Sequence, residues 1–242
     1  MLVKHESFIN SYKGKTALII GGGNSVSALQ KPREWADVVL VLNTANKYFE
    51  RDSDFHLVLE DAPLSIIERM QTGTPRLDLP RLVSPNTKNW PAKLCLLPTE
   101  RLPGAKYWDL TKWSGALPSS IGPLKVVSSV LLQAIHWAAL LGCTTIKLIG
   151  CELRWRDQFK DHFYGDDSAY RTEGNKLNFN TGQCYETLLP GDWRTLDIFQ
   201  FTADYINQAI KEIYRPNQIR IIDYSEGLIT EAERGTPGNA RI

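Results

Sequence analysis

The stretch TALIIGGGNSV, residues 16–26, joins a β-branched apolar run to three consecutive glycines. A short apolar run bounded by glycine is typical of a buried strand, and glycine after a strand allows a tight turn whose amides face outward. A helix starting at Ser25 would point its positive end at the same turn. The stretch matches neither a dinucleotide-binding fingerprint nor a Walker A loop. It therefore predicts a strand followed by either a phosphate-binding turn or a plain tight turn.

The same alternation of strand and helix continues along the chain on both sides of a less regular segment. Apolar runs predict further strands at 36–42, 55–59, 144–149 and 219–222. Helices are expected at 63–70, from about 127 to 142, and from about 196 to Pro216, the last capped by Asp192 or Thr195. This order predicts an α/β, three-layer Rossmann-like fold with a mostly parallel sheet and helices on both faces.

The length of 242 residues and the hydrophobic content of 43% predict a single domain over residues 1–242. Recurrent prolines and short apolar runs at about 71–123 indicate an irregular lid or insertion over the sheet. Residues 151–194 are polar and aromatic without a clear period, which indicates an active-site loop region. The tail after Glu231 lacks apolar periodicity and is expected to be loose.

Charge and composition exclude several classes of partner. The net charge of +1, without a basic run, argues against nucleic acid as a partner. No apolar run reaches about 18 residues, so we expect no membrane span and no secretion signal, and we expect a cytoplasmic location. The four cysteines lack metal-ligand spacing and are expected to be reduced.

Polar side chains at the predicted strand ends are candidates for ligand contacts. Asn43 follows the second strand, and Glu60 and Asp61 follow the third. If these strands are parallel neighbours, their ends lie beside the glycine turn, where open α/β sheets bind ligands. The alternatives are a turn role for Asn43 and helix capping for the acidic pair. Ser128 and Ser129 precede the buried helix, where serine hydroxyls either cap the helix or contact a ligand.

The segment CELRWRDQFKDHFYGDD, residues 151–167, directly follows the strand predicted at 144–149. Its chemically active side chains include Glu152, Arg154, Arg156, Asp161, His162 and Tyr164. His162 is the candidate general base, oriented by Asp161 or Glu152, because histidine titrates near neutral pH; the alternative is an exposed loop histidine. Arg154, Arg156 and Arg171 could neutralise a phosphate or a sugar carboxylate, or form a solvated face.

Several motifs in this order resemble one family. Ser129-Val130, LGC at 141–143, TTIKLIG at 144–150, CELRW at 151–155 and a later histidine resemble the Rossmann-like domain of bacterial motility accessory factors and archaeal MptE-type pterin diphosphokinases. GKTALIIGGGNSV at 14–26 and IRIIDYSEGLI at 219–229 resemble the first and last strands of that domain. A looser similarity reaches bacterial sialyltransferases that use CMP-sialic acid. The resemblance covers about half of the chain.

The resemblance implies a set of roles. It places Gly21, Gly22, Gly23 and Ser25, with Asn24 among them, at the phosphates of a nucleotide, Asn43 near the cytidine or ribose, and His162 as the base that deprotonates the acceptor. Asn24 replaces the proline usual in the family. Glu152 stands where the family more often has aspartate, which keeps a carboxylate and moves it by one methylene.

These observations support three hypotheses. The first is a nucleotide-activated transferase, a glycosyltransferase that uses a CMP-linked or similar nucleotide sugar. The second is a diphosphotransferase acting on a pterin-like alcohol, in which Glu60, Asp61 and Glu152 would hold Mg²⁺ between phosphates. The third is a non-catalytic nucleotide-binding or partner-binding module that uses the tryptophans of residues 90–113.

Overall fold

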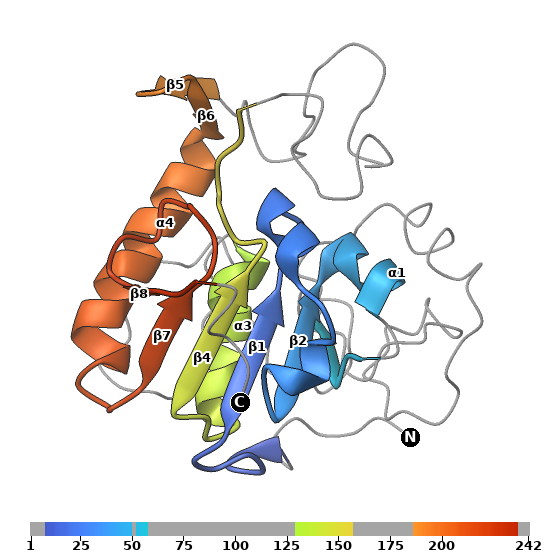
Figure 1. Ribbon diagram of the computed structural model, residues 1–242. Coiled ribbons are helices and arrows are strands. Elements are labelled where there is room, and N and C mark those ends of the chain that lie inside the picture. Colours follow the sequence, from blue (N-terminus) through green and yellow to red (C-terminus); the bar gives the residue numbers. More distant parts are fainter. Residues whose placement is uncertain (1–7, 50–51, 58–128, 157–185, 237–242) are drawn as a thin grey trace, which may run out of the picture.

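The computed structural model describes residues 8–49, 52–57, 129–156 and 186–236 (Figure 1). Within them, a central sheet has six strands in the order β3-β2-β1-β4-β7-β8. The strands are β1 (Thr16–Ile20), β2 (Val38–Leu42), β3 (Phe55–Leu57), β4 (Thr145–Ile149), β7 (Arg220–Asp223) and β8 (Glu233–Arg234). Every neighbouring pair in this sheet is parallel. The predicted α/β fold with its mostly parallel sheet is confirmed.

In the strand order of the sheet, β1, β2 and β3 from the first half of the chain lie together, and β4, β7 and β8 from the second half follow beyond β1. From β1 the chain moves outward to β2 and β3, and it later enters on the opposite side of β1 as β4 and then β7. Ala17 of β1 pairs with Val38 of β2 on one side and with Ile146 of β4 on the other. β1 and β4 are therefore the neighbours at which the strand order reverses. Both are buried on both faces, which explains their continuous apolar runs.

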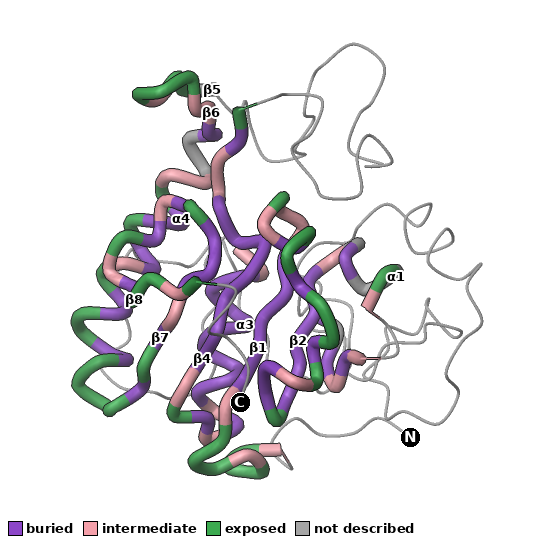
Figure 2. Tube along the Cα trace, in the orientation of Figure 1, coloured by how far each residue is buried: buried purple, intermediate pink, exposed green. Residues whose placement is uncertain are grey.

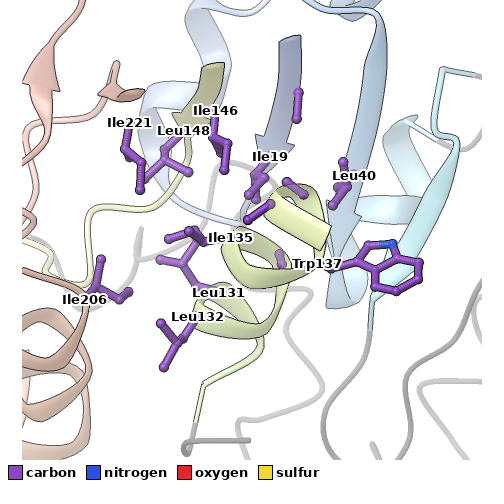
Figure 3. Packing of buried hydrophobic residues seen from close by; sticks show 14 of the residues in the cluster. Ile19, Leu40, Leu131, Leu132, Ile135, Trp137, Ile146, Leu148, Ile206 and Ile221 are labelled. Atoms are coloured by element: carbon purple, nitrogen blue, oxygen red, sulfur yellow. The ribbon is translucent and has the colours of Figure 1, made fainter. Parts of the chain in front are cut away.

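Two long helices cover one face of the sheet. These are α3 (Val130–Leu140) and α4 (Asp197–Ala209). Ile135 and Trp137 of α3 are fully buried and pack with Ile19 and Leu40 in one apolar cluster, as Figure 3 shows. These helices pack against every second side chain of a strand, because side chains alternate between the two faces of a sheet.

Short segments cover the opposite face. They are the 3₁₀ turns η2 (Asn24–Ala28), η3 (Pro32–Glu34) and η4 (Asn43–Ala45), followed by the one-turn helix α1 (Asn46–Phe49). The ring of Trp35 lies 5.1 Å from that of Tyr224, edge to face, in the second apolar cluster. The helix expected from Ser25 is therefore wrong: the chain forms only a five-residue 3₁₀ turn there.

The predicted ends of the two long helices are confirmed only in part. The hydroxyl of Ser129 accepts a hydrogen bond from the Leu131 amide at 3.2 Å and caps α3, which ends just before Gly142 in the left-handed region (φ 88°). The predicted cap of α4 is wrong. Leu196 is the N-cap without a side-chain bond, because the Thr195 hydroxyl donates instead to the Leu153 carbonyl. A π-helical turn, η7 (Ile210–Tyr214), extends α4 towards Pro216.

Three strands were not expected. β5 (Glu186–Leu189) and β6 (Trp193–Leu196) form an antiparallel hairpin beyond the carboxyl ends of the sheet strands, at the top of Figure 1. Figure 2 shows that its turn is exposed, whereas β6 ends in two buried residues. β8 adds to the sheet edge, so the prediction of a loose tail after Glu231 is wrong for residues up to Arg234. The expected helix at 63–70, the lid at about 71–123 and residues 157–185 of the polar loop region lie outside the described residues. No helix in the described ranges is long and apolar enough to cross a membrane.

Candidate functional site

The carboxyl ends of β1, β4 and β7 bring three loops together. They hold the glycine bend (residues 21–25), the loop after β4 (150–154) and the loop after β7 (224–228). The amide of Leu228 donates to the Glu152 carbonyl at 3.0 Å, which joins the second and third loops. Because the strand order reverses between β1 and β4, this is the edge at which sheets of this kind bind ligands.

The amides of the glycine bend are occupied within the protein. Gly21 donates to the Ile149 carbonyl at 2.8 Å, and Gly23 donates to the Gly150 carbonyl at 2.9 Å. The Ser25 amide donates to Oε1 of Glu152 at 2.6 Å, and the Ser25 hydroxyl accepts from the Gly150 amide at 2.8 Å. The expectation that these three amides are exposed to receive an anion is wrong. The ligand-contact role of Gly21, Gly22, Gly23, Asn24 and Ser25 stays a prediction, now one that does not use those amides.

The glycines provide space for the loop after β4. A Cβ on Gly21 would lie 2.1 Å from the Gly150 carbonyl oxygen, and a Cβ on Gly23 would lie 1.5 Å from Oε2 of Glu152. Both are far below any real contact distance. A phosphate-binding turn requires glycine for the same reason, the absence of a Cβ. The motif therefore fits both a bound phosphate and a close contact with the loop after β4.

Glu152 is the buried carboxylate of this edge, with 8% of its surface exposed. Its Oε1 accepts from the Ser25 amide, a charge-assisted bond. Its Oε2 is buried and has no hydrogen-bond partner in the described part of the chain. Leaving a charged oxygen buried without a donor is costly, and such atoms in native proteins call for an explanation. Oε2 of Glu152 thus lacks the hydrogen bond that a buried carboxylate oxygen normally has.

Asp223 forms a second buried carboxylate group at the end of β7. It is fully buried and accepts hydrogen bonds from the amide and hydroxyl of Ser225 and, at 2.6 Å, from Nη1 of Arg234. Arg234 also donates to the carbonyls of Ser225 and Gly227, at 2.7 and 3.2 Å. Burial raises the pKa of Asp223 to about 6; Ser225 and Arg234 oppose the increase, and the charge of Glu152 adds to it.

This shift predicts how Asp223 affects stability. Between about pH 4, the unfolded pKa of aspartate, and the folded pKa of about 6, the folded protein binds more protons at this side chain than the unfolded chain does. This extra proton stabilises the folded protein. The stabilisation is at its full value below about pH 4 and is lost as the pH rises to about 6. We expect the unfolding free energy of the wild type minus that of Asp223→Asn to fall across the window and to level off above it. Urea unfolding at half-unit pH intervals measures this, and a difference that rises with pH would contradict it.

Two arginines lie over one tryptophan on the hairpin side of this edge. The guanidinium carbon of Arg154 is 4.0 Å from the ring centroid of Trp193, and that of Arg156 is 4.4 Å from the same ring. Nε of Arg154 donates to the Glu226 carbonyl at 2.7 Å, in the loop after β7. Burial lowers the pKa of Arg154; the negative charges of Glu226 and Glu152 oppose this decrease, and the positive charges of Arg234 and Arg156 add to it.

The other predicted site residues divide into two groups. Asn43 lies at the end of β2 in the left-handed region (φ 46°) and begins η4, as its turn interpretation expected, and Ser129 caps α3. Ligand contacts by these two stay predictions. Glu60, Asp61, Ser128, His162 and Tyr164 lie outside the described residues. In the residues that the structure does describe, no cluster of three histidine, cysteine, aspartate or glutamate side chains could hold a metal ion.

Sequence reasoning missed Asp223, Arg234 and Trp193. Asp223 directly follows an apolar strand, so the rule that selected Asn43 and the acidic pair at strand ends also applies to it. Arg234 had no such signal, because it belongs to a two-residue strand with no apolar residue. Trp193 follows the Pro190-Gly191-Asp192 turn, which is a recognisable hairpin signal.

Comparison with known proteins gives one informative likeness. No protein-family model matches the chain, and no curated protein sequence matches it. Among solved structures, the MAf glycosyltransferase from Magnetospirillum magneticum AMB-1 is similar, with a TM-score of 0.56 and 16% sequence identity. The match covers 98% of this chain and 38% of that protein. The resemblance to pterin diphosphokinases and sialyltransferases stays a prediction. The chain is thus an α/β domain that shares its Rossmann-like fold with part of a glycosyltransferase.

Proposed function

We propose that the protein transfers a sugar from a nucleotide-linked donor, a CMP-linked or similar nucleotide sugar, to a hydroxyl acceptor. The observation that carries this proposal is the free Oε2 of the buried Glu152 carboxylate at the edge where the strand order reverses. A buried acceptor oxygen at that edge suits a ligand rich in hydroxyl groups, as a ribose and a sugar are. The fold shared with a glycosyltransferase supports the proposal.

Electrostatics decide how such a donor lies. The Glu152 carboxylate occupies the position at the glycine bend in which a phosphate would bind, and two negative charges repel each other there. The donor phosphates therefore lie away from the Ser25 amide. Oε2 of Glu152 accepts a hydrogen bond from a hydroxyl of the ribose or the sugar. Asn43, Gly22, Asn24 and the predicted residues Glu60 and Asp61 complete the donor contacts.

The chemical step is a displacement at the anomeric carbon. The acceptor oxygen forms a bond to that carbon, the bond from the carbon to the donor phosphate oxygen breaks, and the nucleotide leaves with the electron pair. His162 takes the proton of the acceptor hydroxyl, and Tyr164 lies near in sequence to help orient the acceptor. Positive charge beside the leaving phosphate stabilises the transition state.

A binding experiment on Glu152→Gln tests the proposal. The amide oxygen of glutamine can still accept from Ser25, but an NH₂ group replaces Oε2 and cannot accept a hydroxyl hydrogen bond. We expect donor binding to weaken by about 10- to 100-fold, since a hydrogen bond to a charged group contributes about 1.5–3 kcal/mol. Isothermal titration with CMP-sialic acid and UDP-sugars measures the loss.

The matched control is Glu212→Gln, which removes an exposed carboxylate on η7; this turn precedes β7, whereas the three loops follow the carboxyl ends of their strands. Donor affinity should be unchanged in this variant. Equal affinity of wild type and Glu152→Gln would reject the role of Oε2. Failure of the wild type to bind any nucleotide sugar, or consumption of ATP with Mg²⁺ in the presence of a pterin alcohol, would reject the glycosyl transfer itself.

A further inference from the structure

The two arginines over Trp193 are held in place by main-chain pairing. Trp155 and Arg194 form an antiparallel bridge, with amide-to-carbonyl distances of 2.9 and 2.7 Å, so that residues 154–156 run alongside β6. Arg154 and Arg156 are two residues apart in this extended segment, and such residues share a face. Trp193 precedes the bridged Arg194, and each of the two guanidinium groups lies against its ring.

Two positive charges over one ring repel each other, and at Arg154 the negative charges of Glu226 and Glu152 offset this only in part. Neither guanidinium is within salt-bridge distance of a carboxylate in the ranges that the structure describes, and Arg154 has only its Nε bound, to the Glu226 carbonyl. Arg220, by contrast, forms a bidentate pair with Glu233. An aromatic face attracts cations but does not neutralise them. The pair is therefore available to a ligand that carries two negative charges.

We propose that Arg154 and Arg156, positioned by Trp193, bind the dianionic part of the donor: a diphosphate, or one phosphate together with a sugar carboxylate. This inference rests on the proposed function and adds to it the place of the donor's negative charge. Arg154 joins the loop after β7 through Glu226 and is two residues from Glu152. Arg154, Arg156 and Glu152 thus belong to one segment after β4. Planar guanidinium groups suit phosphate and carboxylate oxygens because each offers paired N–H donors.

Inorganic diphosphate is the first probe, because it carries the charge without the nucleotide or sugar. We expect the wild type to bind it, each of Arg154→Gln and Arg156→Gln to weaken binding by about tenfold, and the double variant by about 100-fold. The dependence of affinity on salt should also decrease in the double variant. Arg220→Gln, which removes an arginine at the opposite end of β7, is the control and should bind as the wild type does.

Trp193 is a positioning residue in this inference, and its test separates positioning from folding. Trp193→Leu removes the aromatic face and should weaken diphosphate binding, whereas Trp193→Phe keeps a face and should restore most of it. Near-ultraviolet circular dichroism and urea unfolding check that both variants are folded. Equal affinity of the leucine and phenylalanine variants would reject the role of the ring.

Further ligands identify the source of the charge. If the arginine variants lose UDP but bind CMP-sialic acid as the wild type does, the pair binds a diphosphate. If they lose CMP-sialic acid and bind CMP normally, the pair binds a sugar carboxylate together with the phosphate. No binding of diphosphate to the wild type, or unchanged affinity in the double variant for every anion tested, would overturn the inference. Diphosphate binding that needs both arginines, in a protein that transfers no sugar, would reject the proposed function and leave the inference standing.

Discussion

Gly21→Ala is expected to lower the free energy of unfolding by about 3 kcal/mol or more, at the upper end of the cost of overpacking. The new Cβ would lie 2.1 Å from the carbonyl oxygen of Gly150 and 2.9 Å from its carbon. These are main-chain atoms, so no side chain can rotate away, and β1 and β4 must separate at their carboxyl ends. The Gly21 amide would then lose its bond to Ile149. Urea unfolding followed by circular dichroism measures the change.

Gly14→Ala is the matched control. A Cβ on Gly14 meets no atom within 4 Å, so this substitution adds only the strain of a left-handed backbone (φ 75°), about 1 kcal/mol. A Gly21→Ala variant that does not fold agrees with the expectation. Equal stability of the two variants would show that the β1 and β4 loops do not approach each other as closely as described.

His162→Ala is expected to reduce the turnover of sugar transfer by on the order of 10²- to 10⁴-fold. In the proposed mechanism His162 is the base that removes the acceptor proton, so its loss slows the chemical step and donor affinity should not change. Steady-state kinetics, with donor binding measured separately, tests both statements.

His136→Ala provides the control for this prediction. His136 is buried in α3, and its Nδ1 lies 3.4 Å from the Tyr214 hydroxyl. Its loss should lower stability and leave turnover per folded molecule unchanged. Unchanged turnover in His162→Ala would remove His162 from the mechanism and leave Glu152 and the arginines as the described residues of the site.

The sheet was predictable because its central strands are buried on both faces. The apolar run predicted as a strand at 144–149 forms β4 (Thr145–Ile149). The apolar run before the three glycines forms β1 (Thr16–Ile20). Burial on both faces excludes polar residues, so each strand appears in the sequence as a continuous apolar run. Such a run can be recognised without knowing which strands lie beside it. The long helix α3 was visible for the same reason, since it is buried nearly all round.

The use of the glycine bend was not predictable from the bend alone. Glycine is required wherever another group must approach the backbone, and that group can be a ligand or part of the protein. Here it is Glu152, which is 127 residues away from Ser25 in the sequence. Only the pairing of β1 with β4 brings the carboxylate to the bend. The motif therefore indicated a close approach to the backbone but not which group makes it.

The hydrogen-bond ladder between β1 and β4 continues beyond the strands, through Gly21 and Gly23, into the bend itself. The main chain beneath the candidate site is thus fixed when the sheet forms, before any substrate arrives. A molecule that binds there loses little free energy in rearranging this backbone, a form of preorganisation. Selectivity among substrates would then depend on the side chains around the bend, which can change in evolution while the sheet stays the same.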